Sequence, residues 1–241
     1  MNKIMTADTL HNFAYVNDSI CKKPYRGMVI SFFGLGNMTM YSEDPEDARF
    51  YADNGILYVF PYNNPWCWMN PQAVSYTDEI IDVLFDKFDL PEDFPIVVNG
   101  GSMGGHSCLV YTRYTKRTPV SCIANCPVCD LPFHYTERPD LPRTIYSAFY
   151  NEQGDLEEVL KKSSPVHLAD SMPRIAYHIF HCDRDSAVNI HKHSDLFIEN
   201  MKKAEQNVSY YIVKDRDHCD LSEEMLALYH ELAVKAINGA L

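Results

Sequence analysis

A glycine-rich hexapeptide around Ser102 is the strongest chemical signal in the sequence. Residues 100–105 read Gly-Gly-Ser-Met-Gly-Gly and directly follow a short apolar run at 96–99. The segment fits the pattern G-x-S-x-G, in which a sharp turn between a strand and a helix leaves the serine hydroxyl exposed. The backbone N–H of Met103 would then point to where an oxyanion forms, assisted by the helix dipole. We interpret Ser102 as a nucleophile for acyl transfer. An ordinary glycine-rich turn is the alternative, and the lack of a Gly-Lys-Ser/Thr ending disfavours a phosphate loop.

Two later loops carry residues that could activate such a serine, which needs a general base and an acid that orients the base. Residues 181–188 read His-Cys-Asp-Arg-Asp-Ser-Ala-Val, and residues 214–220 read Lys-Asp-Arg-Asp-His-Cys-Asp. In sites built on this turn, the nucleophile, the acid and the histidine follow one another along the chain. That order makes His218 the predicted base and leaves Asp183 and Asp185 as candidates for the acid.

One other histidine and one cysteine pair are less well placed for a catalytic role. His106 lies one turn beyond the serine and is a weak alternative base. Cys126 and Cys129 form a C-x-x-C pair, but no second pair with zinc spacing follows. We interpret these cysteines as small buried apolar residues, and we expect no metal and no cofactor.

The elements that must position these residues alternate along the chain. An apolar stripe at residues 80, 81, 84, 85 and 88 predicts a helix. The continuous apolar run at 56–60 predicts a strand that is buried on both faces. Asp220 is the expected N-cap of the last helix. Expected strands cover residues 10–16, 28–33, 56–60, 96–99, 120–124, 174–180 and 208–213, and expected helices cover residues 44–54, 71–88, 102–114, 190–206 and 221–237.

This alternation predicts an α/β fold, with a mostly parallel sheet and helices on both faces. We expect one domain over residues 1–241. The carboxyl ends of its strands would bring the three loops together at one edge, where chemistry is usual in such sheets. A proline-rich stretch at about 127–173 breaks the rhythm and predicts a short helical insertion, the lid, over Ser102. Aromatic residues of the lid and of the loop after residues 56–60 are the predicted substrate pocket, although they would serve equally well as packing; they are Trp66, Trp68, Tyr146 and Phe149.

Composition limits the possible partners. The 241 residues carry 21 Lys and Arg against 33 Asp and Glu, a net charge of -12 that disfavours nucleic acid and anionic membrane surfaces. No apolar run approaches the roughly 20 residues of a membrane span. The N-terminus lacks the apolar core of a secretory signal, so we expect a cytoplasmic protein with reduced cysteines.

Four motifs in order make the chain resemble the catalytic domain of the prolyl oligopeptidase family, within the α/β-hydrolase superfamily. They are the Gly-Gly-Ser-Met-Gly-Gly segment, Ser164-Pro165, His181-x-x-x-Asp185-x-x-Val188 and Asp217-His218. The resemblance runs from about residue 28 to the C-terminus. It implies the α/β-hydrolase fold, and it implies Asp185 rather than Asp183 as the acid.

The chain departs from that family at three places. Cys182 and Asp217 stand where the family usually has glycine, and residues 33–36 read Phe-Gly-Leu-Gly in place of a His-Gly-Gly-Gly loop. Because a backbone donor needs no histidine, we expect the second oxyanion donor to be an N–H near Leu35, with Gly34 beside it.

The resemblance implies a serine hydrolase that forms an acyl-enzyme. The chain leaves no room for the N-terminal β-propeller of the oligopeptidases, so a small carboxylesterase is the first expectation. A serine peptidase for small peptides or acyl-peptides is the second. A hydrolase-fold binding protein without turnover is a third possibility. A small ester or a short peptide is the expected partner, while the physiological substrate and the oligomeric state are left open by the sequence.

Overall fold

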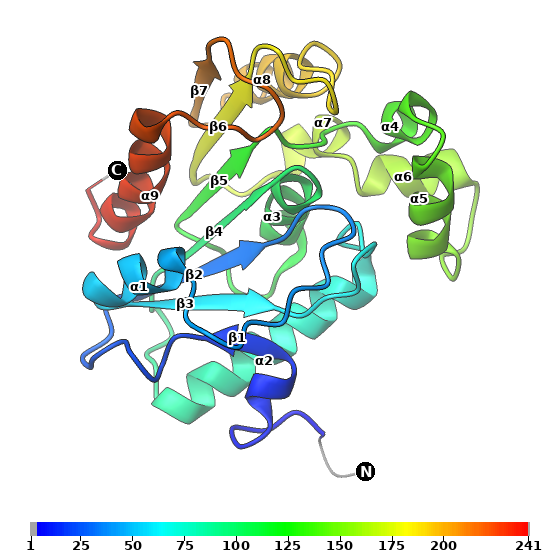
Figure 1. Ribbon diagram of the computed structural model, residues 1–241. Helices are drawn as coiled ribbons and strands as arrows, with labels where there is room; N and C mark the ends of the chain where they lie inside the picture. Colours follow the sequence, from blue (N-terminus) through cyan, green and yellow to red (C-terminus); the bar gives the residue numbers. More distant parts are fainter. Residues whose placement is uncertain (1–3, 241) are drawn as a thin grey trace.

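A seven-stranded sheet forms the centre of the molecule, as seen in the computed structural model, which describes residues 4–240 (Figure 1). Its strand order is β1-β3-β2-β4-β5-β6-β7. Strand β1 runs antiparallel to β3, and each of the other neighbouring pairs is parallel. The strands are β1 (Ala14–Val16), β2 (Gly27–Phe32), β3 (Ile56–Pro61), β4 (Ile96–Gly101), β5 (Ser121–Asn125), β6 (Ala176–Cys182) and β7 (Val208–Val213).

Helices cover both faces of this sheet. Helices α1 and α9 pack on one face and α2, α3 and α8 on the other, while α4, α5 and α6 form a separate group beyond α3 (Figure 1). The helices are α1 (Glu46–Asp53), α2 (Pro71–Phe88), α3 (Met103–Tyr114), α4 (Leu131–Glu137), α5 (Leu141–Phe149), α6 (Leu156–Lys162), α7 (Pro165–Leu168), α8 (Ser194–Lys203) and α9 (Glu223–Ile237), with short 3-10 turns η1 (Leu10–Asn12) and η2 (Ala169–Ser171).

The long helix α2 shows how local sequence sets these elements. It begins after Asn70, whose side chain accepts a hydrogen bond from the N–H of Ala73, and Pro71 occupies its first turn. Its apolar stripe is buried, with Ile80 and Leu84 fully inaccessible to solvent. The bounds predicted for this helix, and those predicted for β7, match the structure.

Three expectations about elements were wrong. The expected strand at 10–16 is divided, because residues 10–12 form the turn η1 before β1. The expected helix at 190–206 begins only at Ser194, since the Asn189 side chain accepts the N–H groups of His191 and Lys192 and holds a turn there. The N-cap of α9 is Ser222 rather than Asp220.

The reason for the changed cap lies in the preceding loop. The Asp220 carboxylate accepts a hydrogen bond from Arg216 at 3.0 Å, and its backbone N–H is donated to the carbonyl of Asp217. Ser222 is therefore the residue whose side chain receives the N–H of Met225. The loop between β7 and α9 is held by its own contacts up to the start of the helix.

The proline-rich insertion is helical, as expected, and consists of α4 to α7 with η2. Glu137 at the end of α4 ties it to the segment before α8. Its carboxylate pairs with His134 Nδ1 at 2.6 Å and His193 Nε2 at 3.0 Å, and it accepts the N–H of Asn189 at 3.0 Å. This cluster fixes one end of the lid to the loop that follows β6.

Two further observations concern membrane-spanning helices and disulfide bonds. No helix within residues 4–240 combines the length and the apolar character that a membrane crossing requires. All eight cysteines are free thiols, and seven of them are buried.

Candidate active site

Ser102 occupies a strained turn between β4 and α3. Its backbone has a φ of 60° and a ψ of -124°. A residue with a side chain rarely adopts this combination. The neighbouring strand holds the turn, since the N–H of Ser102 donates to the Asn125 carbonyl at the end of β5 at 2.9 Å. Strain of this kind persists only where the surroundings enforce it, and it is typical of functional sites.

The glycines around Ser102 are required by close packing. A Cβ on Gly104 would lie 2.1 Å from the carbonyl oxygen of Phe32 in β2. A Cβ on Gly100 would lie 2.4 Å from the Gly104 carbonyl oxygen. Only glycine lets α3 approach the sheet so closely, and this approach gives the turn its sharpness.

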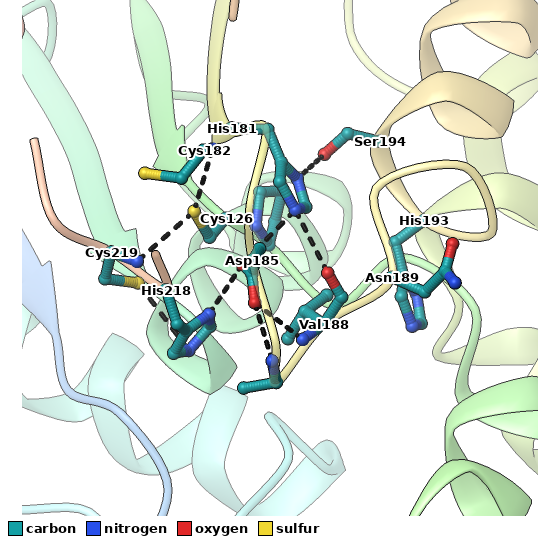
Figure 2. A network of polar contacts seen from close by, with 12 residues as sticks. Cys126, His181, Cys182, Asp185, Val188, Asn189, His193, Ser194, His218 and Cys219 are labelled. Atoms are coloured by element: carbon teal, nitrogen blue, oxygen red, sulfur yellow. Dashed lines mark hydrogen bonds and ion pairs between the residues drawn. The ribbon is translucent and has the colours of Figure 1, made fainter. Parts of the chain in front are cut away.

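Asp185 and His218 are brought together from two different loops. Asp185 follows β6, His218 follows β7, and His218 Nδ1 lies 2.7 Å from Asp185 Oδ2 (Figure 2). The carboxylate of Asp185 is fully buried, whereas the His218 side chain is 24% exposed. The other carboxylate oxygen accepts the N–H groups of Ala187 and Val188, each at 2.8 Å.

These contacts shift both pKa values. Burial favours the neutral acid, but hydrogen bonds from His181, His218 and the Val188 N–H hold the pKa of Asp185 well below its usual range. Burial also lowers the pKa of His218, yet the Asp185 carboxylate and the neighbouring Cys126 outweigh it and raise the pKa to about 9. A buried anion therefore sits beside an imidazole that holds its proton strongly.

Asp183, the other candidate acid, lies elsewhere. Its carboxylate accepts the N–H of Asp215 at 2.7 Å and pairs with Lys214 at 3.4 Å. Of the two carboxylates, Asp185 is the one that contacts the His218 ring.

His181 is a second partner of the acid that sequence reasoning did not assign. Its Nε2 lies 3.2 Å from the Val188 carbonyl and 3.3 Å from Asp185 Oδ2, and its Nδ1 lies 2.6 Å from the hydroxyl of Ser194. The ring is completely buried and braces the acid loop. The spacing His181-x-x-x-Asp185 was visible in the sequence, but nothing there showed that the ring turns inward.

His106, the weak alternative base, lies in the protein interior. It is fully buried, and its ring nitrogens lie 3.1 Å from the Val128 carbonyl and 3.2 Å from the Trp68 carbonyl. Burial lowers its pKa to about 4. Both ring nitrogens are therefore engaged by backbone rather than by the serine.

The second ring nitrogen of His218, Nε2, lies beside the sulfur atom of a cysteine. His218 Nε2 lies 3.7 Å from Cys219 Sγ, and Cys126 stands on the same side (Figure 2). Between the described residues, no hydrogen bond joins the Ser102 hydroxyl to His218. The residues next to them in the chain do approach each other, because Cys219 Sγ lies 3.2 Å from where a Cβ on Gly101 would stand.

Two backbone donors are free beside the serine. No described residue accepts a hydrogen bond from the N–H of Met103, the first residue of α3, or from that of Leu35. The loop after β2 runs close to the turn at Ser102, since a Cβ on Gly34 would lie 3.8 Å from Ser102 Cβ. This arrangement leaves both N–H groups available to an oxyanion.

The four predicted pocket aromatics have different surroundings. Trp68 is 1% exposed, and its indole N–H donates to Thr144 in α5 at 3.2 Å. Phe149 lines a cavity of about 360 Å³ between the lid and α2. Trp66 and Tyr146 are exposed, at 42% and 50%. Trp68 thus packs the loop onto the lid, and a substrate pocket lined by these residues stays a prediction.

Comparison with known proteins gives a clear answer at the level of fold. No protein-family description matches the chain, and no curated protein matches it. Solved structures do match. An S-formylglutathione hydrolase from Agrobacterium tumefaciens has a TM-score of 0.67 at 18% identity, covering 95% of this chain and 88% of its own. Esterase B from Lactobacillus rhamnosis has a TM-score of 0.65 at 10% identity, covering 91% and 80%.

A Mycobacterium tuberculosis puromycin-hydrolyzing peptidase has a TM-score of 0.74 at 15% identity. The match covers 95% of this chain but only 37% of the peptidase, so the chain spans little more than a third of that protein. The sheet order, the strained strand–helix turn at Ser102 and these likenesses agree, and the chain is an α/β-hydrolase-fold protein. The proteins that share its fold include an esterase, an S-formylglutathione hydrolase and a peptidase.

Proposed function

We propose that the chain is a serine hydrolase that cleaves carboxylic ester bonds through an acyl-enzyme. The observation that carries this proposal is the Asp185–His218 pair, held at the sheet edge where the strained turn presents Ser102. A buried carboxylate, an imidazole and a serine at a helix N-terminus are the parts that acyl transfer needs.

In the proposed reaction, Ser102 Oγ attacks the acyl carbon while His218 Nε2 accepts the hydroxyl proton. Asp185 receives the N–H at Nδ1, fixes the tautomer and stabilises the imidazolium. The free N–H groups of Met103 and Leu35 stabilise the oxyanion of the tetrahedral intermediate. The imidazolium then protonates the leaving alcohol. Water next attacks the acyl-enzyme while His218 accepts its proton, and the imidazolium returns that proton to Ser102 Oγ as the acid is released.

One local adjustment is required before attack. In the free protein His218 Nε2 lies beside Cys219 Sγ. The ring must therefore move so that Nε2 contacts the Ser102 hydroxyl when substrate is bound. Catalytic hydrogen bonds are often long or misaligned before the substrate arrives. The ring is attached to an exposed loop and has room for this change, since it is 24% exposed.

A peptidase is the second candidate, and one observation favours it. The puromycin-hydrolyzing peptidase has a TM-score of 0.74 with this chain, above the 0.67 and 0.65 of the S-formylglutathione hydrolase and the esterase. A third candidate is a binding protein that retains Ser102, Asp185 and His218 without turnover. The three differ in whether Ser102 reacts and in which bond is broken.

A fluorophosphonate probe tests whether Ser102 is an active nucleophile. We expect stoichiometric labelling, with the adduct on the peptide that contains Ser102 by mass spectrometry, and no labelling of Ser102→Ala. Ser107→Ala, on the same helix, is the matched control and should label normally. A folded protein that does not react would support the binding protein and contradict the hydrolase.

A panel of p-nitrophenyl esters and aminoacyl-p-nitroanilides then separates the two enzyme candidates. The ester proposal predicts turnover of the esters with at least about a hundredfold preference over anilides of similar size, a difference of about 2.7 kcal/mol in transition-state stabilisation. Comparable or greater kcat/KM on the anilides would favour the peptidase.

A further inference from the structure

Three clusters of potential metal ligands occur among the described residues, and each contains a histidine. The clusters are Cys126–His218–Cys219, Cys126–His181–Asp185 and His134–Glu137–His193, with ligand atoms within 4.8 Å of one another in each. A metal ion needs an unprotonated ring nitrogen, so the tautomer of each histidine decides whether its cluster can bind.

Two of the clusters fail this requirement. His193 Nδ1 accepts the backbone N–H groups of Cys129 and Asp130, so its proton is on Nε2, where it is donated to Glu137. His181 Nε2 faces the Val188 carbonyl, which can only accept, so its proton is on Nε2 and its Nδ1 accepts the hydroxyl of Ser194. In both rings, neither nitrogen is free for a metal.

His218 is different. Its Nδ1 faces the Asp185 carboxylate at 2.7 Å and therefore keeps its proton, so Nε2 is the nitrogen with a lone pair for a metal ion once the ring is neutral. Nε2 lies 3.7 Å from Cys219 Sγ (Figure 2), and Cys126 Sγ lies within 4.8 Å of a nitrogen of the same ring. A carboxylate that holds the distal N–H of a histidine is the usual second partner of a metal-bound imidazole, since it fixes the tautomer and raises ligand basicity.

The thiols are also arranged for a metal. A tetrahedral zinc site with bonds of about 2.3 Å to sulfur and about 2.0–2.1 Å to nitrogen separates those ligand atoms by about 3.6 Å. His218 Nε2 and Cys219 Sγ are 3.7 Å apart. Cys126 Sγ accepts the backbone N–H groups of Cys182 and Cys219, each at 3.4 Å. These contacts hold Cys126 Sγ in place beside His218 and Cys219.

The backbone at both cysteines supports this arrangement. The φ values of Cys126 and Cys219 are 45° and 59°. This left-handed conformation is uncommon for residues with a side chain. Their sulfur atoms lie within 4.8 Å of each other and of a ring nitrogen of His218. Cys129, the other half of the C-x-x-C pair, takes no part, since the recorded partner of its Sγ is the carbonyl of Pro127 at 3.6 Å.

We propose that Cys126, His218 and Cys219 form a binding site for a thiophilic divalent cation such as Zn²⁺, with water as the fourth ligand. Binding releases the two thiol protons, together with the Nε2 proton of a protonated ring, and changes no oxidation state. The ion occupies the Nε2 lone pair that would accept the proton of Ser102, so bound metal inhibits acyl transfer. This inhibitory role rests on the proposed function, whereas binding itself does not.

Binding is tested by titrating Co²⁺ into the Ser102→Ala protein in the presence of a phosphine reductant. Cobalt reports thiolate ligation through its charge-transfer absorption, and a protein without Ser102 excludes the serine as ligand and turnover as a complication. We expect one cobalt per chain, with thiolate charge-transfer bands and tetrahedral d–d bands, and displacement by one equivalent of Zn²⁺.

Variants decide which residues bind. Cys219→Ala is the main variant because Cys219 is partly exposed, and its loss should weaken binding by at least about tenfold. His218→Ala should do the same and tests the site without altering a buried thiol. Cys129→Ala is the matched control and should bind cobalt normally. The proposal is overturned if no thiolate bands form, or if they survive Cys219→Ala but disappear in Cys129→Ala.

The inhibitory role is tested on wild-type Ser102 protein with the ester that it turns over best. Zn²⁺ should abolish turnover at the concentration that saturates binding, and a chelator should restore it. In Cys219→Ala, the concentration that halves the variant's own metal-free rate should rise at least about tenfold. An equal sensitivity of both proteins to Zn²⁺ would contradict inhibition through this site, even if cobalt binds.

Discussion

His218 Nδ1 and Asp185 Oδ2 lie 2.7 Å apart, although they are 33 positions apart in the sequence. The carboxylate is fully buried and accepts two backbone N–H groups at its other oxygen, so its position does not depend on the histidine. The imidazole is thus oriented by a fixed anion. This relationship determines the protonation behaviour of the site and carries the first two predictions.

Asp185→Asn should lower kcat/KM by about 10³–10⁴, because an amide can stabilise the wrong tautomer of His218 and cannot stabilise its cation. Steady-state hydrolysis of a p-nitrophenyl ester measures the effect. Asp183→Asn is the control, since that carboxylate lies on the same loop but contacts Asp215 and Lys214, and its kcat/KM should change only a few-fold. A larger loss in Asp183→Asn would contradict the assignment.

Ester hydrolysis should rise with pH up to about 9. A general base must be neutral, and the pKa of His218 is raised to about 9, so most rings are protonated at pH 7. Plotted against pH, log kcat/KM, corrected for spontaneous hydrolysis, should have a slope of about one below that pKa. A profile that is flat above pH 7 would contradict a raised pKa.

The same shift affects stability with a defined sign. A histidine pKa near 9 in the folded chain lies above the roughly 6.5 of an unfolded one. The stabilisation is therefore complete below about pH 6.5 and is lost as pH rises through 9. Chemical denaturation of Ser102→Ala across this range should show it, and His218→Ala should reduce the loss.

Gly104→Ala should destabilise the protein by about 1–3 kcal/mol or more. The added Cβ would meet the Phe32 carbonyl at 2.1 Å, and neither strand nor helix backbone can give way easily. Thermal unfolding and fluorophosphonate labelling measure the effects on the fold and on Ser102. Gly34→Ala is the control, because the nearest atom to its new Cβ is 3.8 Å away. Its free energy of unfolding should stay within about 0.5 kcal/mol of wild type.

Phe149→Ala should alter acyl-chain preference if the lid cavity receives the acyl group. Phe149 lines that cavity with Met69, Val74 and Val159, and truncation enlarges it. We expect the ratio of long-chain to acetyl ester hydrolysis to change at least about fivefold. Tyr150→Ala is the control, because this neighbour is 70% exposed and does not line the cavity. An unchanged ratio would show that Phe149 only packs the lid, in which case loss of stability should be its sole effect.

The sequence by itself determined the fold class and the strand–turn–helix geometry around Ser102. Local signals sufficed for α2, where an apolar stripe, a capping asparagine and a proline agree. They also sufficed for the glycines beside Ser102, because a strand, a strained turn and a helix must follow one another there. The order of acid and base along the chain predicted which loops to inspect, and the family resemblance favoured Asp185 over Asp183.

Only the tertiary structure decided what surrounds those residues. Which aspartate contacts His218 depends on how β6 and β7 lie side by side. Asp183 and Asp185 are only two residues apart in one loop, and local sequence does not distinguish them. The inward turn of His181 and the meeting of Cys126 with Cys219 arise from segments that are distant in sequence. From the sequence, Trp68 suits a substrate pocket and internal packing equally well. In the structure it is buried, and its indole N–H donates to Thr144 of the lid. Such contacts depend on long-range packing, which residue types and spacing along the chain do not encode locally.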